Sequence, residues 1–338
     1  MIRVMHTLQA PDGTTRYVDH MIGAAPPGVR IMTFTWGRAI FGRYDVLHVH
    51  WPESLVRHPR LAGRAAKRML LEMLLARLRL TRTPIVRTIH NVAPHEPGDS
   101  AEARVLGRID RRTDFWILLQ PGTPSPNEAR SMVIRHGHYR GVFQSEVAAV
   151  RGRMLQFGLL RPYKGVEALI AAFAELDDPR GQLRIVGRPH SADFEAALRR
   201  RAERDRRVSL RLEFVPDAAL IDEIRQAELV VLPYTEMHNS GAVLVALSLD
   251  RPVLVPRSSS TDSLAEEVGE SWVLRYDGPL DAKTLAAARV AAASHRPGRP
   301  DLSGRDWARV GELHGEVYRL ALVPDQPNRA AINRDARA

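Results

Sequence analysis

Residues 230–256 constrain the fold of this chain more than any other stretch. Two short apolar runs rich in β-branched residues, at 230–232 and from 253 onward, flank a polar turn and an apolar helical segment that opens at Asn239 or Ser240. Buried strands joined through a helix are typical of a parallel strand-helix-strand unit. The stretch therefore predicts a parallel sheet with a helix N-terminus at its carboxyl edge.

The polar turn of this unit suits an anion. Asn239 and Ser240 are good N-cap residues, and Gly241 lets a ligand approach the backbone closely. The N–H groups at the start of a helix can hold a phosphate. An ordinary helix cap fits the same residues, so this stretch by itself leaves both alternatives open.

Strand-like and helix-like segments alternate along both halves of the chain. In the first half, strands are predicted at 2–8, 29–34, 45–49, 84–89 and 115–119, and helices at 15–22, 59–80, 101–111 and 125–132. In the second half, strands at 153–157, 183–186 and 211–214 alternate with helices at 166–174, 192–203 and 218–226. This alternation predicts the α/β class, with doubly wound, Rossmann-like parallel sheets that collect ligands at the carboxyl ends of their strands.

The length of 338 residues suits two such domains. We expect a change of domain between 140 and 150, with the two domains facing each other across a cleft. The predicted parts are an N-terminal domain over 1–145, a C-terminal domain over 146–305, an amphipathic helix over 306–323 that packs back on the first domain, and a flexible polar tail over 324–338.

Composition excludes several kinds of site. The chain has no cysteine, which removes disulfides, thiolate nucleophiles and Cys-based zinc sites. Its net charge is +10, but only three of 49 basic residues are lysine, a preference that fits coding bias in a GC-rich genome. No nucleic-acid-binding signature accompanies the charge, so a nucleic-acid partner is not expected. No signal peptide or membrane span is evident, which predicts a cytoplasmic protein.

Two cations follow the first strand of the second half. Arg161 and Lys164 lie between the predicted strand end at Phe157 and the next helix, within the segment FGLLRPYKG. Gly187 follows the next strand, within LRIVGRP, and opens on the same sheet edge. The cations fit an anion site, although solvated loop residues would read the same way.

Four segments in order make the second half resemble the donor-binding domain of GT-B glycosyltransferases of family 4 and its relatives: FGLLRPYKG, LRIVGRP, VVLPYTEMHNSGA and LSLDRPVLVP. The resemblance covers most of residues 153–256. It implies that Arg161 and Lys164 neutralise the diphosphate of a nucleotide sugar, and that Gly187 and Val215 border the nucleotide. It further implies a role in donor binding for Glu236, Asn239, Ser240, Gly241 and Ala242.

The chemistry of sugar transfer agrees with these residues. A sugar leaving a nucleoside diphosphate needs the growing negative charge stabilised by cations and N–H groups. The sequence holds no Asp-x-Asp, so neither a metal nor a cofactor besides the nucleotide sugar is expected. The two glutamates that the family spaces as E-x7-E fall on Met237 and Val245, which leaves a retaining or an inverting outcome open.

Histidines follow several strands of the first half. DVLHVHWPE, TIHNVAPHE and VIRHGHY resemble bacterial exopolysaccharide mannosyltransferases of the GT-B type, some of which form β-mannosidic links from GDP-mannose. This resemblance implies that the first half binds the acceptor. For each single histidine, a strand-end residue satisfied by backbone hydrogen bonds remains the alternative.

An inverting transfer needs a base for the proton of the acceptor hydroxyl. The candidates are Glu53, His90 and Glu96. We expect the acceptor or the donor sugar to meet a further group of residues: Gly13, Thr14, Thr15, His50, His136 and His138.

The helix predicted at 59–80 carries a basic face. Arg60, Arg64, Lys67 and Arg68 are spaced to share one side. A basic amphipathic helix can lie on anionic lipid. A core helix with a solvated basic end is the alternative.

The sequence thus predicts a metal-independent glycosyltransferase that moves a sugar, mannose from GDP-mannose being the expected case, to a glycan or lipid-linked acceptor in cell-surface polysaccharide or glycolipid synthesis. It is expected to be cytoplasmic and to associate peripherally with the inner face of the plasma membrane. Two alternatives are a nucleotide-sugar epimerase of the same fold and a non-catalytic GT-B partner subunit.

Overall fold

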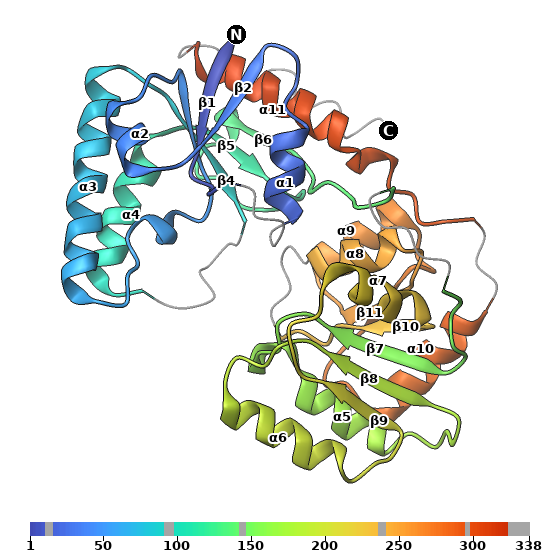
Figure 1. Cartoon of the computed structure of the whole chain (residues 1–338). Coiled ribbons are helices and arrows are strands. Elements are labelled where there is room, and N and C mark those ends of the chain that lie inside the picture. The colour runs from blue at the N-terminus through green and yellow to red at the C-terminus, as the bar shows by residue number, and fades with distance from the viewer. Residues whose placement is uncertain (11–15, 91–97, 142–146, 236–240, 295–297, 324–338) are drawn as a thin grey trace. The chain divides into compact units, whose positions relative to one another are not determined.

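The computed structural model describes residues 1–10, 16–90, 98–141, 147–235, 241–294 and 298–323 (Figure 1). The chain forms two compact units, each described by itself below. It begins in the first unit, enters the second after Gly137 and returns to the first at Gly304.

Six parallel strands form the sheet of the first unit, in the order β2-β1-β3-β4-β5-β6. They are β1 (Ile2–His6), β2 (Val29–Thr33), β3 (Val46–Val49), β4 (Ile85–Ile89), β5 (Thr113–Leu118) and β6 (Ser131–Val133). Its helices are α1 (Arg16–Gly23), α2 (Trp36–Phe41), α3 (Leu61–Leu80), α4 (Ser100–Arg112) and α11 (Trp307–Ala321).

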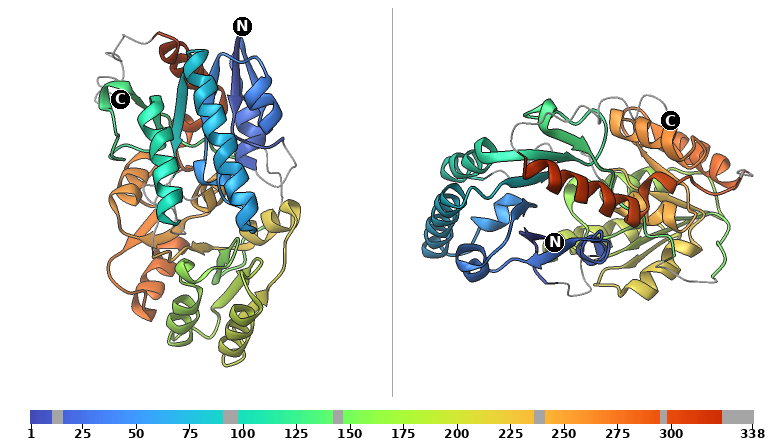
Figure 2. Two further views of the ribbon diagram at one scale, coloured as in Figure 1. Left: turned by 90° about the vertical axis from the view of Figure 1, so that its left-hand side faces the viewer. Right: turned by 90° about the horizontal axis from the view of Figure 1, so that it is seen from above.

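Alternate residues of these strands face two separate cores, as the period of a β-strand requires. Leu47 and Ile85 pack with α2, α3 and α4 on one face of the sheet. Val46 and Val86 pack with α11 on the other face (Figure 2). The last of the described helices therefore completes the first unit.

The second unit repeats the plan with a sheet in the order β12-β11-β10-β7-β8-β9. Its strands are β7 (Arg153–Phe157), β8 (Gln182–Val186), β9 (Val208–Arg211), β10 (Leu229–Val231), β11 (Val253–Pro256) and β12 (Val273–Tyr276). One face is covered by α5 (Val166–Ala174), α6 (Ala192–Ala202) and α10 (Ala282–Ala293). The other face is covered by α7 (Asp217–Gln226), α8 (Gly241–Ser248) and α9 (Ser259–Val268).

Two parallel, doubly wound sheets confirm the predicted fold class. The helix predicted at 125–132 is wrong, since this segment holds a 3-10 turn, Glu128–Arg130, and then β6. Ser131–Val133 pair in parallel with β5 instead, a tertiary contact that ends the helical segment early. The predicted strand at 211–214 is β9, three residues earlier, because Val208 is the residue that packs in the core.

The predicted domain boundary at 145 lies inside the second unit. The Tyr139 N–H donates to Ser248 Oγ at 2.9 Å. Arg140 pairs with Asp250 at 3.1 Å. These contacts attach the chain to the second unit from 138 onward. The tail predicted at 324–338 lies outside the described residues.

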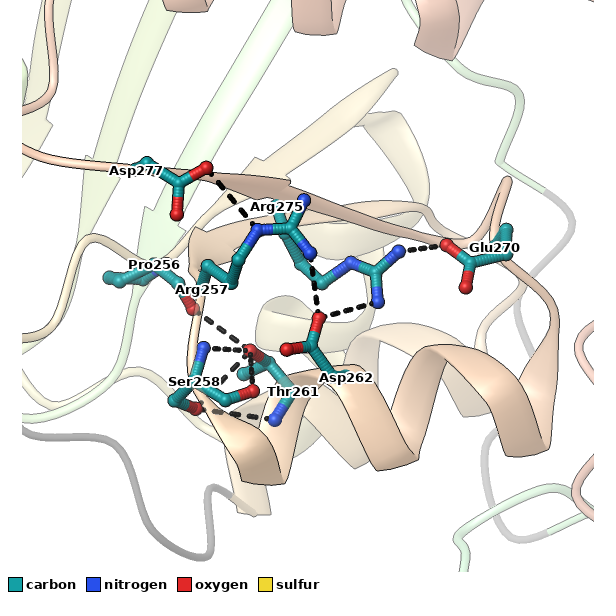
Figure 3. A network of polar contacts seen from close by, with 8 residues as sticks. All are labelled: Pro256, Arg257, Ser258, Thr261, Asp262, Glu270, Arg275 and Asp277. Carbon is teal, nitrogen blue, oxygen red and sulfur yellow. Dashed lines mark hydrogen bonds and ion pairs between the residues drawn. The ribbon is translucent and has the colours of Figure 1, made fainter.

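The start of α9 is fixed by its own side chains (Figure 3). Ser258 Oγ accepts from the Thr261 N–H at 3.2 Å, and Thr261 Oγ1 accepts from the Ser258 N–H at 2.9 Å, which makes a reciprocal capping box. Asp262 accepts from Arg257 and Arg275, each at 2.8 Å. The turn between β11 and α9 is thereby held by contacts within the chain.

Candidate functional site

The loops after β7 and β8 are joined backbone to backbone at the carboxyl edge of the second sheet. The Gly158 N–H donates to Val186 O at 3.0 Å, and the Leu160 N–H donates to Arg188 O at 2.9 Å. Gly187 has φ 145°, and a Cβ there would lie 1.9 Å from Gly158 O. Only glycine allows this approach, so Gly187 sets the spacing of the two strand ends.

Lys164 is partly buried beside the segment that follows β10. Its ammonium lies 5.0 Å from the ring centroid of Tyr234. The Thr235 N–H donates to Tyr163 O at 2.8 Å, which ties this segment to the loop of Lys164. Burial, and then the neighbouring Arg161, lower the pKa of Lys164 to about 8. A bound anion would offset both effects, as expected of a cation placed for a phosphate.

The start of α8 belongs to the same edge. Gly241 and Ala242 are its first residues and are half-buried. Val245, which stands where the family carries a glutamate, packs against the core beneath the helix. Three predicted donor residues lie outside the described residues: Glu236, Asn239 and Ser240.

A pocket of about 460 Å³ opens beside these loops, at the ends of β8 and β9. It is lined by Arg188, His190, Ser191, Glu213 and Phe214, among others. Phe214 is 68% exposed, whereas the predicted residue Val215 is buried in the core. Val215 does not line this pocket, whereas the ring of its neighbour Phe214 does.

At the carboxyl edge of the first sheet, His50 and His90 meet. They follow β3 and β4, and His50 Nδ1 lies 3.0 Å from His90 Nε2. Trp51 has φ 39°, and its ring stacks on His90 with centroids 4.0 Å apart. A non-glycine residue with positive φ at a strand end is strained, and such strain clusters at functional sites.

His50 and His90 belong to a longer series of hydrogen bonds, which we call the imidazole chain: Thr88, His48, Tyr318, His6, His50 and His90. Going inward, His50 Nε2 lies 3.1 Å from His6 Nδ1. His6 Nε2 lies 3.0 Å from the Tyr318 hydroxyl, which lies 2.8 Å from His48 Nδ1. The series ends where His48 Nε2 meets Thr88 Oγ1 at 2.8 Å.

Burial keeps the imidazoles of this chain neutral. Desolvation, with His314 adding to it, lowers the pKa of His6 to about 3. Desolvation, followed by the charges of His136, Arg87 and His314, lowers the pKa of His90 to about 3. The pKa values of His48 and His50 also lie well below the ordinary value, mainly because both rings are buried.

Among the described residues, His6, His48 and His50 form a group that could hold a metal ion. One ring nitrogen of each lies within 4.8 Å of the others. All three are buried and neutral, and a metal ion binds imidazole in its neutral form. The same nitrogens are engaged in the imidazole chain.

The other predicted acceptor-side residues are placed separately. Glu53 lies half-buried in a 3-10 turn, Pro52–Leu55, and its charge faces Arg87. His136 Nδ1 donates to Gly137 O at 2.8 Å, and burial lowers its pKa to about 4. His138 belongs to the second unit, where its ring accepts from the Arg140 N–H at 3.1 Å. Gly13, Thr14, Thr15 and Glu96 lie outside the described residues.

Sequence reasoning missed four members of the imidazole chain: His6, His48, Thr88 and Tyr318. The first three carry a usable signal, because they lie at or next to the last residues of neighbouring parallel strands. Tyr318 carries none, since it is 270 residues from His48 in sequence.

Comparison with known proteins places this geometry in context. Residues 151–294 match the family model described as glycosyl transferases group 1. Two GDP-mannose:glycolipid 4-β-D-mannosyltransferases of Xanthomonas campestris pv. campestris are 44% and 43% identical to this chain over 329 residues, which is 96% of this chain and 94% of each relative.

Solved structures share the fold. HepE of Anabaena, in complex with UDP and glucose, superposes with a TM-score of 0.68 at 16% identity, covering 94% of this chain and 100% of the other. WaaG, a glycosyltransferase of lipopolysaccharide biosynthesis, gives a TM-score of 0.57 at 18% identity, covering 95% and 97% of the two chains. These likenesses confirm the two sheets as a GT-B fold.

Proposed function

We propose that this chain, which belongs to the same family of GT-B glycosyltransferases as the two Xanthomonas campestris enzymes, transfers mannose from GDP-mannose to a glycolipid. The observation that carries the proposal is the 44% identity to a GDP-mannose:glycolipid mannosyltransferase over 96% of the chain. The prediction of a glycosyltransferase is thereby confirmed. The comparisons lend no support to an epimerase, and both relatives are named as transferases rather than as partner subunits.

The second unit would hold the donor. Lys164 and Arg161 would neutralise the diphosphate together with the backbone at Gly241 and Ala242. Two cations and the start of a helix stabilise the charge that develops on the leaving diphosphate, so this arrangement needs no metal. The pocket lined by Phe214 and Arg188 would take the nucleoside.

The reaction inverts the anomeric centre in this proposal. GDP-mannose carries its sugar in α linkage, and the product named for the relatives is β. The acceptor oxygen would attack C1 of mannose while the bond from C1 to the diphosphate oxygen breaks. The hydroxyl proton would pass to a base of the first unit, and GDP would leave with the bonding electron pair.

We assign the role of base to a carboxylate rather than to His90. Burial lowers the pKa of His90 to about 3, so this ring has little affinity for the hydroxyl proton. Glu53 is the candidate carboxylate among the described residues. His90 would then act as a neutral hydrogen-bonding group beside the reacting hydroxyl.

The predicted basic face of α3 does not suit lipid. Arg64 donates to His58 O at 2.8 Å, and Lys67 donates to Ser54 O at 2.9 Å. Arg68 makes two bonds to Asp99, at 2.9 and 2.8 Å. Three of the four predicted cations therefore bond within the chain, which favours another face of α3 for the membrane contact.

The outward face of α3 is apolar instead. Exposed apolar residues recur three or four positions apart along the whole helix: Ala62, Ala65, Ala66, Met69, Met73, Ala76 and Leu80. Met69 is 60% exposed and Leu80 is 86% exposed, and Phe41 of the neighbouring α2 is 82% exposed. No described helix combines the length and apolarity to cross a bilayer. We assign this stripe to shallow contact with the membrane that carries the acceptor.

The direct test is release of GDP from GDP-mannose with and without a glycolipid acceptor. We expect much faster release with acceptor, and little turnover of UDP-glucose or dTDP-glucose in parallel reactions. Release from GDP-mannose that ignores the acceptor would contradict the transferase assignment. A preference for another sugar nucleotide would contradict the assigned donor.

A further inference from the structure

We propose that Tyr318, on α11, is a positioning residue that fixes the tautomer and orientation of His90 through the imidazole chain. The two residues do not pair directly. Tyr318 reaches His90 through His6 and His50, by hydrogen bonds of 3.0, 3.1 and 3.0 Å in turn. The proposal rests on the proposed function only in placing the acceptor near His90.

A neutral imidazole has one N–H and one acceptor nitrogen, so a bond made by one nitrogen dictates the role of the other. His6, His50 and His48 each use both ring nitrogens within the chain. The donors must therefore all point the same way along the series. The imidazole chain has two self-consistent states. In one, every donor is directed toward Thr88, and in the other, every donor is directed toward His90.

The two states give His90 opposite chemistry. When His90 donates through Nε2, its Nδ1 carries the lone pair and accepts a hydrogen bond. When His90 accepts at Nε2, its Nδ1 carries the proton and donates. Which state is populated decides whether His90 can accept from a sugar hydroxyl or donate to an oxygen that gains charge.

Tyr318 is the member of the imidazole chain that can determine the direction of its hydrogen bonds. Its hydroxyl can donate to only one of its two imidazole partners, and when it does so its oxygen accepts from the other. Its side chain is fully buried in the core that α11 forms with the first sheet. Among the described residues of this unit, the charged or titratable groups outside the imidazole chain that act on its rings are His136, Arg87 and His314.

The geometry of the imidazole chain differs from that of a metal site. In a metal site the ligand nitrogens converge on one point about 2.0–2.1 Å from each of them. Here the ring nitrogens meet in successive pairs, with the Tyr318 oxygen between His6 and His48. Neutral rings joined in series fit tautomer coupling, because each hydrogen bond of the series links one ring to the next member.

The test compares Tyr318→Phe with Tyr44→Phe. Tyr44 is a matched control, because it is also buried in the first unit and donates one hydrogen bond, to Ala39 O at 2.7 Å, outside the imidazole chain. Nitrogen NMR with ring-labelled histidine reports the tautomer of each imidazole. We expect Tyr318→Phe to change the resonances of His50 and His90, which Tyr318 does not hydrogen-bond, as well as those of His6 and His48.

Activity gives a second measurement. We expect Tyr318→Phe to lower kcat roughly tenfold, the effect of one misdirected hydrogen bond, while GDP affinity stays unchanged. Tyr44→Phe should retain both kcat and the His90 resonances. Altered His90 resonances with unchanged kcat would contradict a role in the reaction but not the proposed donor and acceptor.

A second variant changes Thr88, at the end of the imidazole chain opposite His90. Thr88→Val removes the last hydroxyl without changing the shape of a side chain that is 2% exposed. If the chain couples its members, this variant also alters the His90 resonances. Changes confined to the nearest ring in both variants would overturn the proposal, as would a stoichiometric metal ion in the purified protein.

Discussion

Lys164 shows how surroundings adjust one cation for its ligand. Its pKa of about 8 results from burial and from Arg161, so the ammonium loses its proton as the pH rises through 8. A diphosphate attracts the charged form, and donor binding should therefore weaken between about pH 7.5 and 9.5. Calorimetry with GDP across this range measures the effect.

Lys164→Arg is the matched control for this prediction. A guanidinium keeps its charge throughout the range, so its GDP affinity should depend less on pH than that of the wild type. Lys164→Ala should bind GDP weakly at every pH. Equal pH dependence in the wild type and the arginine variant would contradict a role for Lys164 titration.

Alanine variants of Gly187 and Gly278 distinguish the effect of a steric clash from the effect of an unfavourable backbone conformation. Both have positive φ, at 145° and 71°, but a Cβ at Gly187 would lie 1.9 Å from Gly158 O, whereas a Cβ at Gly278 meets nothing within 4 Å. Gly187→Ala should cost roughly 1–3 kcal/mol of unfolding free energy from backbone strain, with the clash added. It should also weaken GDP binding, because the loops after β7 and β8 separate.

Gly278→Ala is the control, and should cost only about 1–2 kcal/mol with GDP affinity retained. Thermal unfolding and calorimetry on the two variants measure both effects. Equal losses of GDP affinity would show that the joined strand ends do not shape the donor site.

At the scale of elements, strand ends were predictable but helix faces were not. The carboxyl ends of parallel strands lie at one edge of a sheet. The sequence alone therefore placed His50 and His90 at this edge, because each directly follows a predicted strand. The spacing of Arg64, Lys67 and Arg68 correctly gave a shared face. It could not reveal that these three cations bond to His58 O, Ser54 O and the Asp99 carboxylate.

The region after β11 shows a second limit. α9 opens with five polar residues after its cap, and α10 is mostly alanine. Neither helix has the apolar periodicity from which an amphipathic helix is predicted. Their positions follow from the parallel pairing of β12 with β11, a tertiary contact that no local pattern contains.

The apolar stripe of α3 makes a prediction at this scale. Met69 and Met73 are 60% and 45% exposed, and each would add roughly 1.5 kcal/mol or more on entering a lipid interface. A variant with Met69→Glu and Met73→Glu should therefore float poorly with phosphatidylglycerol-containing vesicles. Ala103→Glu, which places a carboxylate at an exposed position of α4, should float like the wild type. Equal flotation of all three proteins would remove α3 from the membrane contact.

For the whole molecule, the return of the chain to its first unit links the two ends of the sequence. α11 places Val310, Val317 and Tyr318 in the core on one face of the first sheet. Its glycines allow close contact, since a Cβ at Gly311 would lie 1.9 Å from Ala24 O. The first unit is therefore complete only after the second has been synthesised.

A chain ending at Ser303 should lose the first unit and keep the second. Burial of Val310, Val317 and Tyr318 contributes roughly 1.5–3 kcal/mol each, a sum comparable with the net stability of a domain. The second unit, residues 138–303, contains both of its own cores and the candidate donor site. Limited proteolysis of the truncated chain should therefore degrade residues 1–137 and leave a fragment that binds GDP with nearly wild-type affinity, without transferase activity. A truncated chain that resists proteolysis throughout would contradict the role of α11, whereas loss of GDP binding in a protected fragment would show that the donor site needs the first unit.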